Sequence, residues 1–492
     1  MKKEFLEKLK EKERTELPKV LMAAAECAPL AKTGGLADVI GTLPKILAGL
    51  GMEARVILPY HRVIKNKYHD QVEHMFYFYV NLGWRREYVG MEKLILDGVT
   101  FYLVDNEHYF GDKIYYGGDA EIEQYAYFSR AVLDALPNLD FQPDIVHCND
   151  WHTAMIPMLA RTQYRGLMQD SLRYLLSIHN IAFQGRCDFG FARDLLGIDD
   201  RYYTSEYMEL NGCADFLKAG CVFADRLGTV SPSYAQEIRT PYFAEGLEGV
   251  LNMRAADLSG ILNGIDRDVF NPRTDPLLPA HYDRGHRKGK AVCKQSLQQC
   301  MGLEVRPDVP IFAMVTRMTE QKGFDLVECV LDDLMQNEDI QFMLLGTGDD
   351  RFENFMRAAE GRYRGRLCSY IGYSEETAHL IYAGSDFFLM PSRFEPCGLG
   401  QLIAMRYGCV PIVRETGGLK DTVTPYNRFT GGGNGFSFAN FDAWEMRDAM
   451  RNAISCYRNE EIMNGLIESA MGADFGFQRS AEEYIRLYID ML

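Results

Sequence analysis

The sequence predicts an α/β protein with two doubly wound parallel sheets, and three observations support this fold class. The chain has 492 residues, more than a single hydrophobic core usually spans. Short β-rich apolar runs alternate with amphipathic stretches of roughly 10 to 15 residues, as in sheets whose strands are joined by crossover helices. Glycine-bearing and charged motifs follow several of these runs, at the strand ends where such sheets bind ligands. We therefore expect two domains that face a ligand-binding cleft.

Five runs in the first half and four in the second are expected to be strands. They are residues 19–26, 53–60, 143–148, 172–179 and 226–231, and then 309–317, 340–346, 386–392 and 410–415. A turn-rich segment from Asn263 to Pro310 separates the two sets, and we expect the hinge near Asn263. The predicted parts are a charged extension (1–18), a first domain (19–262), a second domain (263–474) and a C-terminal helix (475–492).

Composition excludes several classes of protein. Hydrophobic residues make up 47% and charged residues 25%, which is typical of a globular chain. The formal net charge of -16 argues against a nucleic-acid partner, which needs a broad basic face. The twelve cysteines form no CxxC pair and no cluster with histidine, so neither zinc nor disulfides are indicated. Without a signal peptide or an apolar stretch of ~20 residues, we expect a cytoplasmic protein that has no membrane partner.

The first motif, KTGGLADV, follows the run at 19–26 and leads into an amphipathic helix. Gly34 and Gly35 would let backbone amides approach a phosphate at the helix N-terminus, and Lys32 would add a positive charge. An ordinary strand-to-helix turn with a surface lysine explains this motif equally well when it is taken alone.

The second motif consists of HCNDWHT and SIHNIAFQG, which follow two further runs. Asp150, His179 and Asn180 could bond to sugar hydroxyls there, and Trp151 could pack on a sugar face. For a single histidine, a satisfied buried side chain is the commoner explanation. The presence of both loops favours a site.

The third motif, VTRMTEQKGFDL, places Arg317 and Lys322 five residues apart across an irregular turn. Arg offers phosphate a bidentate fork and Lys a compact charge, so the two could hold a diphosphate without a metal. Two solvated cations on a loop would be the simpler explanation for this motif alone.

The fourth motif, PSRFEPCGLGQL, places Glu395 before a glycine-bearing turn that starts a helix. The amides of Cys397, Gly398, Leu399 and Gly400 could face an anion or sugar hydroxyls, although an acid that stabilises the helix dipole would look the same. RETGGLKDTV supplies another glycine turn before a helix, which could pack close to the nucleotide or could equally be only a turn. Asp266 and Asp268 form the one Asp-x-Asp pair, which we assign to capping in the hinge, so no metal site is expected.

Together these motifs resemble bacterial glycogen synthases and plant starch synthases. The likeness runs from about Lys19 to the C-terminus and includes KTGGLADV, HCNDWHTAMIP, SIHNIAFQG, TVSPSYAQEI, GILNGID, RMTEQKG, PSRFEPCGLGQL and TGGLKDTV in the family's order. It implies two Rossmann-like domains of the B-type glycosyltransferase fold, with a C-terminal helix that crosses back to the first domain. It also implies transfer of glucose from ADP-glucose to an α-1,4-glucan with retention, and no cofactor or metal.

The resemblance also assigns roles to residues. Arg317 and Lys322 would hold the diphosphate and stabilise the departing ADP, while Glu395 and the amides after it would orient the glucose. Around the sugar and phosphate it places Lys32, Gly34, Gly35, Asp38, Asp150, His179, Asn180 and Asn263, and against the adenine Tyr373. The departing phosphate would help to deprotonate the acceptor 4-hydroxyl, so no protein nucleophile is required.

Three functions are compatible with these residues to different degrees. A glucan synthase is favoured over another nucleotide-sugar transferase because Ile403 stands where related retaining enzymes carry a second glutamate, and Gln401 is present as in glucan synthases. A silent glucan-binding protein would need a broken site, which the motifs do not show. The chain departs from the family at Gly400, where threonine is common. The choice between ADP- and UDP-glucose and the formation of a homo-oligomer are left open.

Overall fold

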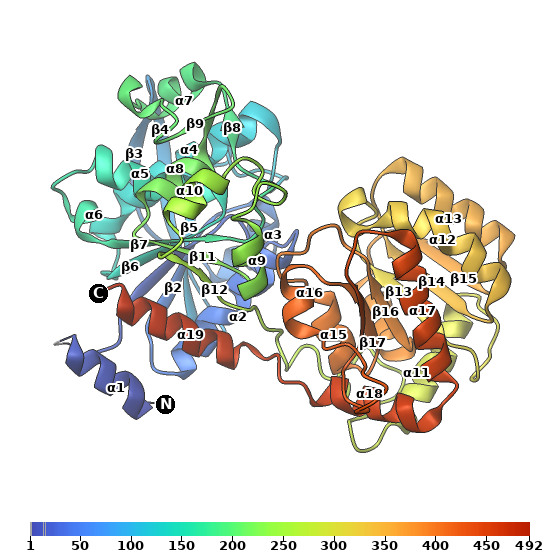
Figure 1. The fold of residues 1–492 in the computed structure, drawn as a ribbon. Coiled ribbons are helices and arrows are strands. Elements are labelled where there is room, and N and C mark those ends of the chain that lie inside the picture. Colours follow the sequence, from blue (N-terminus) through green and yellow to red (C-terminus); the bar gives the residue numbers. More distant parts are fainter. Residues whose placement is uncertain (1, 13, 15) are drawn as a thin grey trace. The chain divides into compact units, whose positions relative to one another are not determined.

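The computed structural model describes residues 2–12, 14 and 16–492. The chain divides into two compact units (Figure 1): unit 1 runs to Asn263 and includes Phe477–Leu492, and unit 2 is Gly264–Gly476. The divisions fall one and two residues later than the expected 262 and 474. Residues 475 and 476 lie with unit 2, where Ile265 N–H donates to Phe475 O at 2.8 Å and Arg267 pairs with the preceding Asp474 at 2.8 Å.

Unit 1 is built on a nine-stranded sheet with the order β12-β11-β7-β6-β1-β2-β5-β4-β3. Its strands are β1 (Val20–Ala23), β2 (Ala54–Pro59), β3 (Glu73–Leu82), β4 (Arg85–Leu96), β5 (Val99–Asp105), β6 (Ile145–Asn149), β7 (Arg173–Ile178), β11 (Arg226–Thr229) and β12 (Leu258–Gly260). From β12 to β5 neighbouring strands are parallel, as expected. β4 pairs antiparallel with both β3 and β5, so the sheet is mixed rather than wholly parallel.

Helices and a small sheet complete unit 1. The helices are α1 (Lys2–Glu11), α2 (Gly35–Gly49), α3 (Arg62–Tyr68), α4 (Gly118–Ala135), α5 (Met155–Thr162), α6 (Met168–Ser171), α7 (Phe189–Leu196), α8 (Phe216–Phe223), α9 (Pro232–Glu237), α10 (Glu248–Met253) and α19 (Phe477–Asp490). The small antiparallel sheet contains β8 (Arg186–Cys187), β10 (Cys213–Asp215) and β9 (Glu209–Leu210). Among the described residues no helix is long and apolar enough to cross a membrane.

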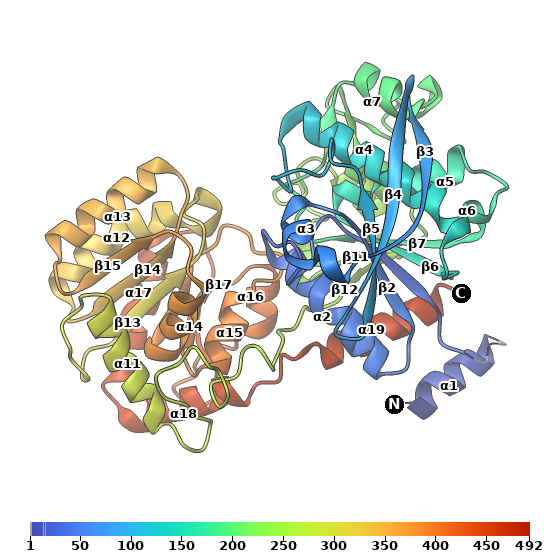
Figure 2. The same cartoon turned by 180° about the vertical axis from the view of Figure 1, so that it is seen from behind.

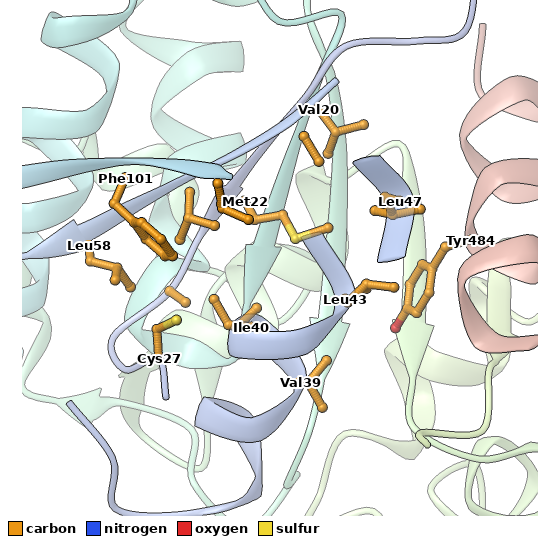
Figure 3. Close-up of a cluster of buried hydrophobic side chains, with 14 of the residues drawn as sticks. Val20, Met22, Cys27, Val39, Ile40, Leu43, Leu47, Leu58, Phe101 and Tyr484 are labelled. Atoms are coloured by element: carbon orange, nitrogen blue, oxygen red, sulfur yellow. The ribbon is translucent and has the colours of Figure 1, made fainter. Parts of the chain in front are cut away.

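The C-terminal helix α19 packs on unit 1, which confirms that it crosses back. Apolar residues of α2 recur at helical spacing and form one buried face. Figure 3 shows Leu43 and Leu47 of that face beside Tyr484 of α19, within the core that also contains β1. The extension contributes α1, whose Lys8 lies 3.6 Å from Asp490 and whose Leu9 is buried. The extension is therefore packed against the C-terminal helix.

Unit 2 contains a six-stranded parallel sheet with the order β15-β14-β13-β16-β17-β18. Its strands are β13 (Ile311–Val315), β14 (Gln341–Gly346), β15 (Leu367–Ile371), β16 (Phe387–Met390), β17 (Val410–Arg414) and β18 (Phe436–Phe438). Its helices are α11 (Lys288–Cys300), α12 (Phe324–Asn337), α13 (Asp350–Arg362), α14 (Glu375–Gly384), α15 (Gly400–Arg406), α16 (Gly417–Thr422), α17 (Ala443–Tyr457) and α18 (Glu460–Gly472).

Both faces of the unit 2 sheet are covered, as a doubly wound fold requires. Successive side chains of β13 enter different cores: Phe312 and Met314 pack with α12 and α17, whereas Ile311 and Ala313 pack with α11 and α14. This explains why residues 309–315 are continuously apolar instead of alternating.

Candidate active site

In unit 1, the predicted site residues gather at the carboxyl ends of three neighbouring strands. The KTGG turn follows β1, Asp150 follows β6, and His179 with Asn180 follows β7. Because β7, β6 and β1 are adjacent in the sheet, the fold brings the first two motifs to one edge. The sequence predicted that each motif follows a strand, and the sheet order makes those strands neighbours.

A buried glutamate that the sequence analysis did not single out fixes the KTGG turn. Oε2 of Glu26 accepts the Thr33 N–H at 2.5 Å, the Thr33 hydroxyl at 2.6 Å and the Gly34 N–H at 3.2 Å. Burial raises the pKa of Glu26, against the effect of these hydrogen bonds. The Gly34 amide is thus bonded to Glu26, whereas Gly35 begins α2 with an N–H that has no acceptor inside the helix.

Lys32 and Asp38 form an ion pair beside this turn. Lys32 Nζ lies 2.7 Å from Asp38 Oδ1, and 44% of the lysine side chain is exposed. A partly exposed ammonium on a long side chain can leave such a pair at little cost, since surface ion pairs contribute about 0 to 1 kcal/mol. Lys32 is therefore able to contact an anion at the start of α2.

Asp150 has the most strained backbone among these residues. Its φ of 57° and ψ of -177° lie in a region that glycine alone adopts easily, at a cost of about 1–3 kcal/mol. Asp150 Oδ1 accepts the His179 N–H at 2.6 Å and the Asn180 N–H at 3.3 Å. Burial raises the pKa of Asp150 to about 7, and nearby Glu26 adds to the effect. Backbone strain and perturbed carboxyls are both common at functional sites, so these features agree with the prediction of a site at Asp150.

His179 is held as a neutral imidazole. Its Nε2 lies 2.9 Å from Asn149 Oδ1, while Asn149 Nδ2 donates to the carbonyls of Ala23 and His147. Since the amide oxygen can only accept, Nε2 carries the proton and Nδ1 keeps its lone pair. Burial lowers the pKa of His179 to about 3. His179 can therefore accept a hydrogen bond from a sugar hydroxyl.

Trp151 and Asn263 occupy buried positions in unit 1. Trp151 packs against the ring of Tyr125 and over Gly185, where an added Cβ would lie 2.2 Å from the indole. This places it in the core, so the predicted packing on a sugar face is wrong for this conformation. Asn263 is 6% exposed, and its Oδ1 has no hydrogen-bond partner among the described residues. An unsatisfied buried amide is costly, which is consistent with a ligand contact at Asn263.

In unit 2, Lys322 and Glu395 form the central ion pair. Lys322 follows β13 and Glu395 follows β16, and these strands are neighbours in the sheet. Lys322 Nζ lies 2.7 Å from Glu395 Oε2, and the side chains are only 16% and 8% exposed. The Ser392 hydroxyl donates to the same oxygen at 2.9 Å. No residue in the described part of the chain forms an ion pair with Arg317, so its positive charge is available to an anion.

The side chain of Gln401 stabilises the turn from Cys397 to Gly400. Gln401 Nε2 donates to the carbonyls of Cys397 and Gly398 at 3.0 and 2.9 Å, which explains its place in the motif. No side chain caps the start of α15 at Leu399. Its first amides have no acceptor inside the helix, and their contact with an anion or with hydroxyl groups stays a prediction.

The second glycine turn, RETGGLKDTV, packs directly on Glu395. The Gly418 N–H donates to Glu395 O at 3.2 Å, and a Cβ at Gly417 would lie 1.9 Å from that oxygen. Arg414 of β17 donates to the carbonyls of Ser392 and Arg393. The sequence left the role of this motif open, and the structure assigns it to holding the Glu395 turn.

Three further sequence predictions concern Ile403, Tyr373 and the pair Asp266 and Asp268. Ile403 is 7% exposed and lies in a hydrophobic core of unit 2, so no ligand group is offered there. Tyr373 follows edge strand β15 and is 80% exposed, which leaves its ring free to stack. Asp266 Oδ1 accepts the Asp268 N–H at 2.9 Å, which agrees with capping.

Across residues 2–12, 14 and 16–492, no three His, Cys, Asp or Glu side chains are grouped to hold a metal ion.

Comparison with known proteins identifies the family. Residues 19–253 match the family described as "Starch synthase catalytic domain", and residues 302–470 match "Glycosyl transferases group 1". A glycogen synthase of Geobacillus thermodenitrificans is 50% identical over 475 residues, which cover 96% of this chain and 98% of that protein. The chain belongs to the glycogen and starch synthase family. The glycogen synthase of Bacillus subtilis is 45% identical and covers 96% of this chain and 97% of its own.

Solved structures agree with this family and with the B-type glycosyltransferase fold. The catalytic domain of starch synthase IV from Arabidopsis thaliana, bound to ADP and acarbose, superimposes with a TM-score of 0.89 at 32% identity and covers 97% of this chain and 99% of that one. A sucrose-phosphate synthase from Thermosynechococcus elongatus, with a TM-score of 0.62 at 16% identity, covers 96% and 98% and shares the fold. As a member of this family, the chain is a hexosyltransferase that acts in glycogen or starch synthesis.

Proposed function

We propose that the chain transfers glucose from ADP-glucose to the 4-hydroxyl at the non-reducing end of an α-1,4-glucan, with retention at the anomeric carbon. The observation that carries this proposal is the buried Lys322–Glu395 pair, together with Arg317, which follows the same strand as Lys322 and forms no ion pair among the described residues. A nucleotide-sugar donor has two parts with opposite needs: an anionic diphosphate that requires cations and a sugar that offers hydroxyl donors. This cluster supplies both.

In this proposal, unit 2 binds the diphosphate and stabilises ADP as the leaving group. Arg317 binds the diphosphate with its guanidinium fork, and Lys322 supplies a second positive charge. Negative charge grows on the departing ADP in the transition state, so cations fixed in advance stabilise it most. Glu395 accepts hydrogen bonds from glucose hydroxyls, and the amides after it contact the sugar or phosphate. Neutralisation by protein cations is the basis for expecting activity without a divalent metal.

Unit 1 provides the polar surface for the sugar and acceptor. The lone pair at His179 Nδ1 accepts from a glucose hydroxyl, and Asp150 fixes the loop that carries His179 and Asn180. The donor phosphate takes the proton of the acceptor 4-hydroxyl on the face from which ADP departs. The C–O bond to ADP breaks as the new glycosidic bond forms. No covalent sugar–enzyme intermediate is formed.

ADP is favoured as the nucleotide because a structural relative at 32% identity is described with ADP bound. The exposed ring of Tyr373 is available to stack on adenine. Like the donor itself, this stacking is part of the proposal.

The test measures nucleotide release and chain extension with a glycogen primer. Purified protein should release ADP from ADP-glucose far faster than UDP from UDP-glucose, and new linkages should carry the α configuration by proton NMR. Activity should persist in excess EDTA. Faster turnover of UDP-glucose would refute the donor, β-linked product would refute retention, and loss of activity in EDTA with recovery in Mg²⁺ would refute the role of Arg317 and Lys322.

A further inference from the structure

The C-terminal helix α19 reaches the sheet of unit 1 through a row of buried polar side chains. Figure 2 shows the end of α19 beside β6, as does Figure 1 from the other side. The Tyr488 hydroxyl of α19 lies 2.9 Å from His147 Nδ1 on β6, and His147 Nε2 lies 2.7 Å from the Ser177 hydroxyl on β7. These three side chains are at most 1% exposed. We refer to them as the polar triad.

Packing alone does not require polar side chains at this place. The core around them contains apolar residues of β1, α2 and α19. Burial and the proximity of His179 lower the pKa of His147 to about 3, so its imidazole is neutral and each ring nitrogen bonds to one hydroxyl. Apolar side chains of the same shape would fill the space without burying polar groups. Hydrogen bonds of fixed geometry instead specify one arrangement of the elements that they join.

A glycine on the next strand leaves room for the Ser177 hydroxyl. Gly228 of β11 lies opposite Ser177 in the parallel ladder, and a Cβ there would lie 2.6 Å from Ser177 Oγ. Any larger residue at this position would meet the hydroxyl and displace it. The sheet therefore accommodates the bond between Ser177 and His147 at a point where its neighbouring strand carries no side chain.

The main chains of His147 and Ser177 hold the two loops of the candidate active site. The His147 carbonyl accepts Asn149 Nδ2 at 3.1 Å, and Asn149 is the residue bonded to His179 Nε2. The Ser177 carbonyl accepts the Asp150 N–H at 2.9 Å, and the Asp150 carboxyl in turn holds the His179 N–H. Both connections end at His179, so a shift of either strand residue displaces this side chain.

At its other end, α19 is tied to the places where the chain passes between the units. The helix begins at Phe477, directly after the second crossing. The Ser480 hydroxyl in its first turn donates to Leu262 O at 2.5 Å, next to the first crossing at Asn263. From Ser480 to Tyr488 the helix rises about 12 Å. One helix therefore joins both crossings to the polar triad.

We propose that Tyr488 and His147 are positioning residues for His179, so that the docking of α19 on unit 1 sets the geometry of the two loops. The inference rests on the proposed function, in which His179 accepts a hydrogen bond from glucose. A displaced His179 weakens that bond and misaligns the sugar, and misplacement by about 1 Å can lower a rate about 100-fold. In the proposed function Arg317 and Lys322 hold the diphosphate, so donor binding depends little on the triad.

The first experiment compares Tyr488→Phe with Tyr174→Phe. Tyr488→Phe removes the hydroxyl that bonds to His147 and keeps the ring that stacks on Tyr484. Tyr174 is the matched control, because it is equally buried at the amino end of β7 and its hydroxyl donates to Gln169 O at 2.6 Å. Both variants should lose a similar amount of melting temperature, since each loses one buried hydrogen bond.

The two variants should differ in their kinetics with ADP-glucose and a glycogen primer. We expect Tyr488→Phe to lower kcat about tenfold with a KM for ADP-glucose within about twofold of wild type, and Tyr174→Phe to change neither. Equal kcat values in the two variants overturn the proposal.

A double-mutant cycle tests whether the triad acts through His179. In a His179→Gln background Tyr488→Phe should lower kcat no further, because residues that act as a unit are not additive. Ser177→Ala interrupts the triad on the side of the sheet. It should lower kcat in the wild type as Tyr488→Phe does, and should have no effect in the His179→Gln background. Losses that add to that of His179→Gln overturn the proposal.

A spectroscopic measurement does not require turnover. Isotope-labelled histidine gives NMR signals of the ring nitrogens, and the signal of His179 is the one that His179→Gln removes. Tyr488→Phe should shift the His179 Nε2 signal by more than its linewidth, whereas Tyr174→Phe should leave it in place. An unchanged signal in a protein that transfers glucose refutes the role of the triad alone. A shifted signal in a protein that transfers no glucose refutes the proposed function alone.

Discussion

Substitution Asp150→Asn tests the electrostatics of unit 1 directly. The asparagine can still accept the N–H groups of His179 and Asn180, but it cannot ionise. Burial raises the pKa of Asp150 from 3.8 to about 7. Because each unit of pKa difference corresponds to 1.36 kcal/mol, ionising this carboxyl costs the folded protein about 4 kcal/mol.

The sign of the effect follows from proton linkage. Below pH 3.8 the carboxyl is protonated in both the folded and the unfolded protein, so Asp150 does not lower the free energy of unfolding. As the pH rises toward 7 the unfolded chain releases this proton before the folded one does, and the free energy of unfolding of the wild type falls. The stability of Asp150→Asn relative to wild type should therefore increase by about 4 kcal/mol between pH 4 and pH 8.

Tryptophan fluorescence makes the measurement specific to unit 1. The chain has three tryptophans, and a Trp84→Phe/Trp444→Phe background leaves buried Trp151, next to Asp150, as the reporter. Urea unfolding is followed at several pH values in this background with and without Asp150→Asn. Asp188→Asn is the control, since the exposed Asp188 caps α7 through the Phe191 N–H. A difference that stays constant with pH for Asp150→Asn, as expected for the control, would refute the reasoning.

Three other variants test unit 2 and the KTGG turn. Lys322→Ala should lower kcat about 100-fold or more, since 1.36 kcal/mol of transition-state stabilisation is tenfold in rate, and near-normal ADP release would refute its role. Gly400→Thr should lose about 1–3 kcal/mol of stability, because its Cβ would lie 2.9 Å from Phe388 Cε1. Adding Phe388→Leu should restore part of the lost melting temperature. Equal melting temperatures of Gly400→Thr and wild type would contradict this packing. Glu26→Ala should raise KM for ADP-glucose several-fold more than it lowers kcat, and an unchanged KM would exclude Glu26 as a positioning residue.

Much of the fold was predictable because parallel strands buried on both faces leave continuous apolar runs. All nine runs singled out in the sequence contain strands of the two large sheets. β3 was missed because only Val80 and Leu82 of it are buried, so EHMFYFYVNL mixes polar and aromatic residues instead of forming an apolar run. β4 was missed because charged residues surround its buried stretch from Val89 to Met91. The unit boundary was placed within one residue at Asn263 because turn residues cluster after it.

The candidate site was predictable where its residues follow strands directly. Lys322 and Glu395 are 73 residues apart in the sequence, yet both follow strands that the fold makes neighbours. Glu26 was not predicted, because its role depends on how the chain folds back after β1 to place the Thr33 and Gly34 amides on one oxygen. The core position of Trp151 likewise depends on its contact with Gly185, which no local pattern reveals. Gly400 is explained by Phe388, a packing partner on another element.

The buried acids of the candidate site differ in their bonding partners, and this difference indicates that they have different roles. Glu26 and Asp150 are bonded mainly to backbone amides, and burial raises the pKa of both. They stabilise turns in exact positions, and near neutral pH Asp150 exchanges a proton with little cost. Glu395 instead faces an ammonium at 2.7 Å, so its charge is balanced by a side chain that a diphosphate can also attract. A chain with a net charge of -16 can thus attract an anionic donor, because in unit 2 the charge of Glu395 is balanced by Lys322 and Arg317 adds a positive charge that no ion pair among the described residues balances.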